Sequence, residues 1–181
     1  MNVFWFKRDL RLLDNQALNE CLKEKSLLIY IYEPSLINDK HYSNRHFQFI
    51  KDSILDLNKQ LEKYNTKILE LQEEATNVFE FLIDELEINN VYSNQETGIN
   101  KTYQRDKLLK KLFERKKVKW YEYPSNGISR GLKNRDIWVG YWNKIMSSNI
   151  PKTTIDPLKV MSLVSLCLTH WGVSTTLKAV S

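Results

Sequence analysis

Short apolar runs, rich in β-branched and aromatic residues, alternate along the chain with longer segments in which apolar residues return every three or four positions. The first pattern is typical of β-strands and the second of amphipathic helices. The predicted strands are residues 3–6, 27–32, 67–71, 91–92 and 118–121. Residues 27–32 are almost continuously apolar, as expected of a strand whose two faces are both covered by helices. The pattern therefore predicts an α/β fold with a doubly wound parallel sheet.

The predicted helices each have one apolar stripe. In the longest helix the stripe consists of Phe47, Ile50, Ile54, Leu57, Leu61 and Tyr64. In a later helix it consists of Leu108, Leu109, Leu112 and Phe113, which leaves Lys107, Lys110, Lys111 and Arg115 mostly outward. Asp14 and Asn15 precede a further helix that is expected from Gln16, and both residue types can cap a helix.

Composition excludes several classes of protein. A chain of 181 residues with 42% hydrophobic residues, 5 Gly and 4 Pro is typical of one globular domain and not of a disordered chain. Cys21 and Cys167 are too few and too far apart for a disulfide framework, which fits a reducing compartment. The first apolar run, residues 3–6, is too short for a signal peptide or a membrane span. We therefore predict a cytoplasmic protein.

The net charge of +5 conceals an asymmetry along the chain. Residues 1–90 carry 11 basic and 16 acidic side chains, whereas residues 101–135 alone carry 12 basic and 3 acidic ones. The ordinary interpretation is a solvated helix face followed by a basic loop, and the alternative is a surface that meets phosphates or an acidic partner. If this block binds DNA, we expect binding to be non-specific and to weaken steeply with salt.

The composition changes after Pro157. Residues 158–181 include 13 apolar residues among 24 and no acidic residue, yet the longest apolar stretch, residues 160–168, is shorter than the ~20 residues that cross a bilayer. We therefore divide the chain into an α/β domain, residues 1–148, and a linker with an atypical apolar tail, residues 149–181. Such a tail is expected to meet a partner or to result from a frameshift, a premature end or a cloned domain boundary.

The sequence offers little for metal or nucleophilic catalysis. His41, His46 and His170 have no zinc-binding spacing to either cysteine, and we expect His41 and His46 to be surface or helix-capping residues. Cys21 lies in a helical pattern and is predicted to be a packed thiol. We therefore predict no catalytic side chain and no metal site.

The first strand leads into Lys7-Arg8-Asp9-Leu10-Arg11, which contains no glycine, so the dinucleotide-binding fingerprint is absent. Ligands of doubly wound sheets nevertheless bind beyond the carboxyl ends of the strands, here residues 6–10, 33–35 and 94–98. The alternating charges of Arg8, Asp9 and Arg11 suit either an acidic ligand or a salt-bridge cluster that fixes the loop.

Residues 5–18, Trp-Phe-Lys-Arg-Asp-Leu-Arg-Leu-Leu-Asp-Asn-Gln-Ala-Leu, resemble the opening signature of the DNA photolyase and cryptochrome family. Further segments agree with that family in sequence order: Ile31-Tyr32-Glu33-Pro34, Arg45-His46-Phe47, Val91-Tyr92-Ser93-Asn94, Arg105-Asp106 and residues 125–146, the last of which resemble a bacterial photolyase-like branch. The resemblance implies a Rossmann-like five-stranded parallel sheet of order 3-2-1-4-5. It also implies an antenna chromophore, such as a folate, a deazaflavin or a flavin.

In this family a helical domain follows in cis and binds FAD, and the light-excited reduced flavin gives an electron to a pyrimidine dimer flipped out of DNA. The residues that would hold FAD have no counterpart here, so the resemblance implies a truncated chain that neither binds FAD nor repairs DNA alone and at most holds the antenna chromophore. The antenna-binding residues implied by matching position are Lys7, Arg8, Asp9, Leu10, Glu33, Pro34, Asn94, Gln95 and Glu96. Trp138 and Trp142 match the domain boundary, which implies packing or interface aromatics rather than redox residues.

Two other functions stay open. A cryptochrome-like light sensor without repair activity has the same amino-terminal motifs, because the distinguishing residues lie in the helical domain. A stand-alone nucleotide-binding or partner-binding module could use the same scaffold.

Overall fold

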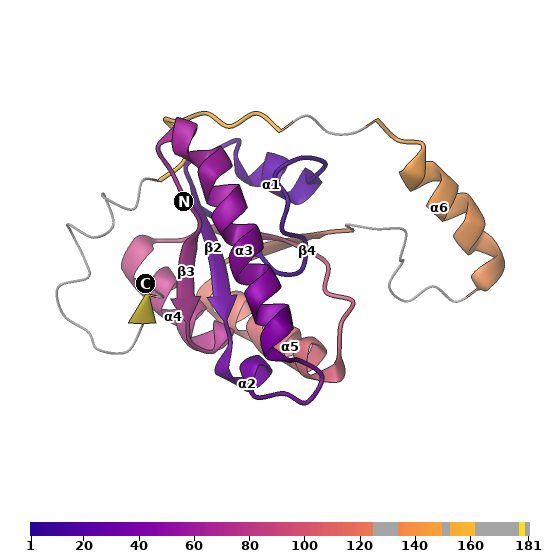
Figure 1. The fold of residues 1–181 in the computed structure, drawn as a ribbon, viewed down its shortest axis with the longest axis horizontal. Helices are drawn as coiled ribbons and strands as arrows, with labels where there is room; N and C mark the ends of the chain where they lie inside the picture. Colours follow the sequence, from indigo (N-terminus) through magenta and orange to yellow (C-terminus); the bar gives the residue numbers. More distant parts are fainter. Residues whose placement is uncertain (125–133, 150–152, 162–177, 180–181) are drawn as a thin grey trace.

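A central β-sheet carries helices on both of its faces (Figure 1). The computed structural model describes residues 1–124, 134–149, 153–161 and 178–179. The elements are β1 (Asn2–Phe6), α1 (Gln16–Cys21), β2 (Ser26–Tyr32), α2 (Pro34–Ile37), α3 (Asn44–Leu61), η1 (Glu62–Tyr64), β3 (Leu69–Gln72), α4 (Ala75–Leu86), β4 (Asn90–Asn94), α5 (Asn100–Lys116), β5 (Lys119–Tyr123), η2 (Arg135–Ile137), α6 (Trp138–Met146) and β6 (Lys178–Ala179). Within these residues no helix is long and apolar enough to cross a membrane.

The five parallel strands lie in the order β5-β4-β1-β2-β3. Read from the other edge this is 3-2-1-4-5, so the predicted fold is confirmed. β1 is central: its Trp5 pairs with Ile29 of β2 on one side and with Ser93 of β4 on the other. The apolar pattern did not predict β6, a two-residue strand that pairs antiparallel with β3.

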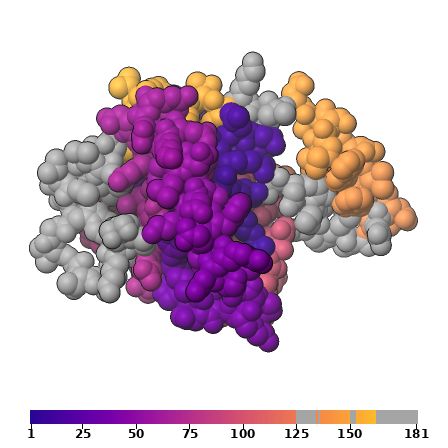
Figure 2. Space-filling model, viewed as in Figure 1, coloured from indigo at the N-terminus to yellow at the C-terminus, as the bar shows by residue number. Residues whose placement is uncertain are grey.

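Each face of the sheet has its own hydrophobic core. α4 and α5 pack on one face, where Trp5 and Phe79 are fully buried. α1 and α3 pack on the other face, and Figure 2 shows the molecule from this side. The predicted stripe of α3 is confirmed, since its members are buried or packed against this core. The stripe of α5 was predicted too broadly: Leu108 is 57% exposed, because it lies about 100° around the helix from the buried Leu109.

The loop after β1 is fixed by a helix cap. Asn15 Oδ1 accepts a hydrogen bond from the Leu18 backbone N–H at 3.1 Å, so Asn15 caps α1 as predicted. Asp14 does not cap this helix. It adopts a left-handed conformation with φ of 52°, and its carbonyl oxygen accepts a hydrogen bond from Arg11 Nε.

Part of the predicted tail packs against the domain. Ile155 and Val160 are buried in the core on the α1 and α3 face. The Ser26 backbone N–H donates to the Lys159 carbonyl at 2.7 Å, and Met161 N–H donates to the Ser26 carbonyl at 2.9 Å, which attaches this segment to the start of β2. Most of the apolar tail, residues 162–177 and 180–181, lies outside the described residues.

The basic helix α5 is largely paired with acids of the first half of the chain. Arg115 lies 2.9 Å from Glu80, and Lys116 lies 2.6 Å from Asp84, both on α4. These contacts favour the ordinary interpretation of the basic block as a helix face paired on its own fold. Its loop part, residues 125–133, lies outside the described residues.

Candidate functional site

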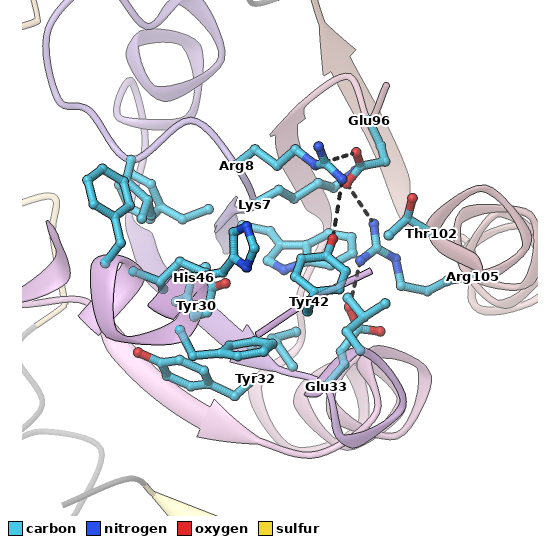
Figure 3. Close-up of a pocket in the computed structure, with 18 of the residues that line it drawn as sticks. Lys7, Arg8, Tyr30, Tyr32, Glu33, Tyr42, His46, Glu96, Thr102 and Arg105 are labelled. Atoms are coloured by element: carbon cyan, nitrogen blue, oxygen red, sulfur yellow. Dashed lines mark hydrogen bonds and ion pairs between the residues drawn. The ribbon is translucent and has the colours of Figure 1, made fainter. Parts of the chain in front are cut away.

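A cavity of about 580 Å³ lies beyond the carboxyl ends of β1 and β2, where α2, the start of α3 and the first turns of α5 surround it. One side is aromatic: Tyr30 and Tyr32 of β2 meet edge to face at 4.8 Å, and Phe47 of α3 lines the cavity beside them. Figure 3 shows Tyr30, Tyr32 and His46 on one side and the ion-paired side chains of Arg8, Glu96, Arg105 and Glu33 on the other. The cavity therefore has an apolar, ring-lined half and a charged half.

Arg105 is the centre of the charged half. Its guanidinium lies 2.6 Å from Glu33, 2.8 Å from Asp106 and 3.5 Å from Glu96. The same group lies over the ring of Trp5, 4.7 Å from its centroid. Burial alone would lower the pKa of Arg105, but the carboxylates of Glu33 and Asp106 raise it, so the side chain stays charged. Three acids from three different parts of the chain are thus held by one cation.

Lys7 is a second buried cation at the end of β1. Its ammonium lies 3.3 Å from Asp106 and between the rings of Trp5 and Trp120, at 4.5 and 4.8 Å from their centroids. Burial lowers the pKa of Lys7, and Asp106 opposes this shift. Burial also raises the pKa of Glu33, against the effect of Arg105. The charged half is therefore already neutralised within the protein.

The segment between α2 and α3 closes one side of the cavity. Tyr42 lies at the cavity, and its hydroxyl accepts a hydrogen bond from Arg8 Nη2 at 3.2 Å (Figure 3). Lys101 of α5 contacts this segment at Asp39, at 2.6 Å, and also contacts α2 at the Ser35 carbonyl, at 2.9 Å. The hydrogen bond from Lys101 holds the pKa of Asp39 well below its usual range. α5 therefore anchors this segment.

His46 has the capping role expected of it. Its Nδ1 accepts a hydrogen bond from the Ser43 backbone N–H at 3.0 Å, in a reciprocal cap at the start of α3. Because Nδ1 is an acceptor, the proton of the neutral ring lies on Nε2. His41 is exposed and pairs with Asp39, as expected of a surface residue.

Comparison with known proteins now decides the family. The DNA photolyase family model matches residues 2–129. The chain belongs to this family. The deoxyribodipyrimidine photo-lyase of Buchnera aphidicola is 32% identical over 124 residues, which cover 64% of this chain and 25% of the relative. Cryptochrome-1 of Spalax judaei is 30% identical over 115 residues, 61% of this chain and 19% of the relative. The chain thus spans a quarter or less of these relatives and corresponds to the amino-terminal domain.

Solved structures agree on the fold. An archaeal photolyase from Sulfolobus tokodaii, solved with two FAD molecules, superposes with a TM-score of 0.69 at 23% identity over 86% of this chain and 37% of its own. A class III photolyase from Agrobacterium tumefaciens gives a TM-score of 0.66 at 20% identity over 89% of this chain and 34% of its own.

The residues implied by the family resemblance fall in two places. Lys7, Arg8, Leu10, Glu33 and Glu96 line the main cavity. Asp9, Asn94 and Gln95 instead line a space of about 60 Å³ between the ends of β1 and β4. Pro34 lines neither and is the first residue of α2.

The interpretation of the first loop as a salt-bridge cluster agrees with the structure. Arg11 lies 3.4 Å from Asp9 and 3.8 Å from Asp14, and Arg8 Nε lies 3.0 Å from Glu96 Oε1. Of these residues, only Arg8 and Glu96 line the main cavity. Their ion pair is therefore the part of the cluster that a ligand in this cavity could also contact.

Several lining residues escaped the sequence analysis as site residues. Tyr30 and Tyr32 were predicted as strand residues, Tyr32 also within a segment quoted for the family resemblance, and Tyr42 was not singled out. Arg105, in the Arg105-Asp106 pair quoted for the family resemblance, was not recognised as the centre of the charged half. The spacing of 72 residues between Arg105 and Glu33 carries no local signal.

Other candidate groups lie away from the cavity. Cys21 is buried in the α1 core, as predicted for a packed thiol, and burial raises its pKa to about 12. No three His, Cys, Asp or Glu side chains gather as metal ligands in the described parts of the chain. Trp138 and Trp142 are both 39% exposed with rings 6.2 Å apart, on α6, which stands away from the sheet (Figures 1 and 2).

Proposed function

We propose that this chain is the light-harvesting domain of a photolyase-like flavoprotein and that a flat aromatic chromophore, a folate, a deazaflavin or a flavin, occupies the main cavity. The observation that carries the proposal is the aromatic half of that cavity, at the end of the sheet where ligands of doubly wound folds bind. Its volume lies within the ~300–1,000 Å³ typical of small-molecule sites.

The residues present fit such a group. Tyr30, Tyr32 and Phe47 provide ring faces and edges for stacking. The charged half offers a rigid polar wall, because Arg105 and its acids hold one another and need no ligand to be satisfied. The bound chromophore would supply light absorption, while the protein positions it and excludes water.

Titration of the chain with a folate, a deazaflavin and a flavin tests this proposal. Binding of at least one should shift its absorption or quench its fluorescence. Leu36→Trp, which adds bulk from α2 to the cavity wall, should weaken binding by about tenfold or more, because steric overpacking costs about 1–3 kcal/mol. Leu55→Trp is the matched control, since Leu55 is 51% exposed on α3 and lines none of the cavities described above.

Unchanged spectra with all three compounds, alongside tight binding of a plain nucleotide, would favour a stand-alone nucleotide-binding module instead. Circular dichroism of both variants establishes that they fold. Equal binding by Leu36→Trp and wild type would place the chromophore elsewhere.

For a protein that also contains the helical FAD domain, we propose light-driven repair of pyrimidine dimers in DNA. FAD and the damaged base would be held by that domain and not by residues of this chain. A cryptochrome-like sensor is the second candidate, because Cryptochrome-1 proteins match this chain nearly as well as a photolyase does. A light-dependent loss of pyrimidine dimers from DNA, measured with the two-domain protein, would favour the photolyase. No loss of dimers while reduced FAD is bound would favour the cryptochrome-like sensor.

A further inference from the structure

In the described part of the chain, the easily oxidised rings that line the main cavity are those of Trp5, Tyr30, Tyr32 and Tyr42. A light-excited heteroaromatic ring is a stronger oxidant than the same ring in its ground state, so it can take an electron from an indole or a phenol. Each of these side chains is therefore a potential electron donor to a chromophore in the cavity. Their surroundings decide which of them can give up an electron.

Cations disfavour two of these donors, Trp5 and Tyr42. The Lys7 ammonium lies 4.5 Å and the Arg105 guanidinium 4.7 Å from the centroid of the Trp5 ring. Loss of an electron would give the indole a positive charge, and two cations at this distance oppose that charge. The Tyr42 hydroxyl accepts a hydrogen bond from Arg8 Nη2 at 3.2 Å, so its oxygen faces a cation and not a group that takes up a proton.

Tyr32 differs from the other rings in having a base as its partner. Its hydroxyl donates a hydrogen bond to Glu70 Oε2 at 2.8 Å, and Glu70 lies on β3, the strand beside β2. Tyr30 lies two residues earlier on β2 and is buried to the same degree, at 8% exposed against 9% for Tyr32. Among the described residues, no carboxylate accepts a hydrogen bond from Tyr30. The two tyrosines are therefore alike in position and differ in their proton acceptor.

Burial makes this acceptor decisive. If Tyr32 lost only an electron, it would become a buried cation, which costs much free energy. If it lost only its proton, it would become an anion beside Glu70, and burial, the hydrogen bond to Glu70 and the charge of Glu70 all raise the pKa of Tyr32. Loss of both particles leaves a neutral ring and places the proton on Glu70, which is only partly buried. The site therefore favours a coupled transfer.

We propose that Tyr32 and Glu70 form a proton-coupled electron donor to a light-excited chromophore in the main cavity. Tyr32 gives one electron to the chromophore while its O–H bond breaks and the proton moves to Glu70 Oε2. The products are a neutral tyrosyl radical, a protonated Glu70 carboxyl and the chromophore with one added electron, and the reverse transfer restores the pair. This inference rests on the proposed chromophore site and gives it a photochemical outlet that competes with energy transfer to FAD.

Time-resolved fluorescence of the bound chromophore tests the pair. Riboflavin, a deazaflavin and methenyltetrahydrofolate are the probes, each measured without oxygen and with saturating protein, so that differences in affinity do not enter. At least one bound probe should show a fast decay in wild type, slower in D₂O than in H₂O, that Tyr32→Phe loses. Glu70→Gln should slow this decay about tenfold, or ~1.4 kcal/mol, because the amide accepts the hydrogen bond without charge and does not take up the proton.

Two spectroscopic signatures identify the products of the transfer. Illumination of wild type should give the electron paramagnetic resonance signal of a neutral tyrosyl radical and an infrared band of a protonated carboxyl. Tyr32→Phe should lose both signals, and Glu70→Gln should lose the carboxyl band. Tyr64→Phe is the matched control, since Tyr64 packs partly buried against the core that includes Tyr32 and lines none of the cavities. It should retain both signals, and circular dichroism establishes that all variants fold.

A fast decay that survives Tyr32→Phe and is lost in Tyr30→Phe would assign the electron to Tyr30 and overturn the pair. An unchanged rate in Glu70→Gln would show that Glu70 takes no proton and would overturn it too. If a probe binds but no bound probe shows the fast decay, this inference fails and the proposed function stands. If none of the three probes binds, the proposed function fails with it.

Discussion

Replacing Arg105 by Met tests whether one cation holds the charged half of the cavity together. Arg105 is 11% exposed, and its carboxylate partners Glu33, Glu96 and Asp106 are only 3%, 4% and 7% exposed. Removing one partner of a buried pair costs about 3–5 kcal/mol, because the remaining charge stays buried without compensation. Met retains much of the volume over Trp5, so the loss of packing adds little. A domain of this size loses ~2–4 °C per kcal/mol, so we expect the melting temperature to fall by about 10 °C.

Thermal unfolding followed by circular dichroism measures this loss, with Arg115→Met as the control. Arg115 also forms an ion pair, 2.9 Å from Glu80, but the two side chains are 66% and 50% exposed. Such a surface pair contributes at most about 1 kcal/mol. Losses of similar size in the two variants would refute the assignment of Arg105 as the centre of a buried network.

The pH dependence of the same variant gives a second readout. Burial raises the pKa of Glu33 in the folded protein, and Arg105 opposes that shift, so its removal should raise the pKa further. A carboxyl whose pKa is higher in the folded state binds its proton more tightly there, so acidification toward that pKa stabilises the fold. The difference in melting temperature between wild type and Arg105→Met should therefore become smaller as the pH is lowered from about 7 to about 5. A difference that widens over this range would contradict the network.

Two further predictions concern the face that α1 covers. Asn15→Ala should lower the free energy of unfolding by about 1 kcal/mol in a urea titration, because the Leu18 N–H loses its cap, whereas Asn15→Ser should lose much less. In a Cys167→Ser protein, Cys21 should react with a thiol reagent only after unfolding, since it is fully buried and its pKa is raised to about 12. Rapid labelling of the native protein would show that α1 opens.

The fold was predictable because its signals are local. The continuous apolar run of β2 and the stripe of α3 each arise within one element, and a parallel sheet with helices on both faces is the arrangement that buries them. The strand order came from the family resemblance and not from periodicity. The short β6 could not be predicted, because two residues are too few to show an alternation.

The cavity was predictable only in part, because the residues of its charged half are conspicuous in the sequence and those of its aromatic half are not. The loop residues Lys7 and Arg8 stand out as charges at the end of an apolar strand. Tyr30 and Tyr32 do not stand out, because side chains at alternate positions of a strand share one face of the sheet, and residues on that face of β2 form the core as well as the cavity wall. The pairing of Arg105 with Glu33 joins residues 72 positions apart and depends on the strand order, so only the assembled fold reveals it.

The position of the main cavity is explained by the ion pair that fills the point where the strand order of the sheet reverses. In a doubly wound sheet the ligand crevice is expected where the strand order reverses, here between β1 and β4. The Arg8–Glu96 ion pair occupies this position and leaves a space of only about 60 Å³. Gly98 makes room for the pair, since a Cβ there would lie 2.4 Å from Arg8 Nη2 and 2.6 Å from Glu96 Oε1. Gly98 therefore accommodates a side-chain ion pair at this position, and the larger volume lies beside the tyrosines of β2.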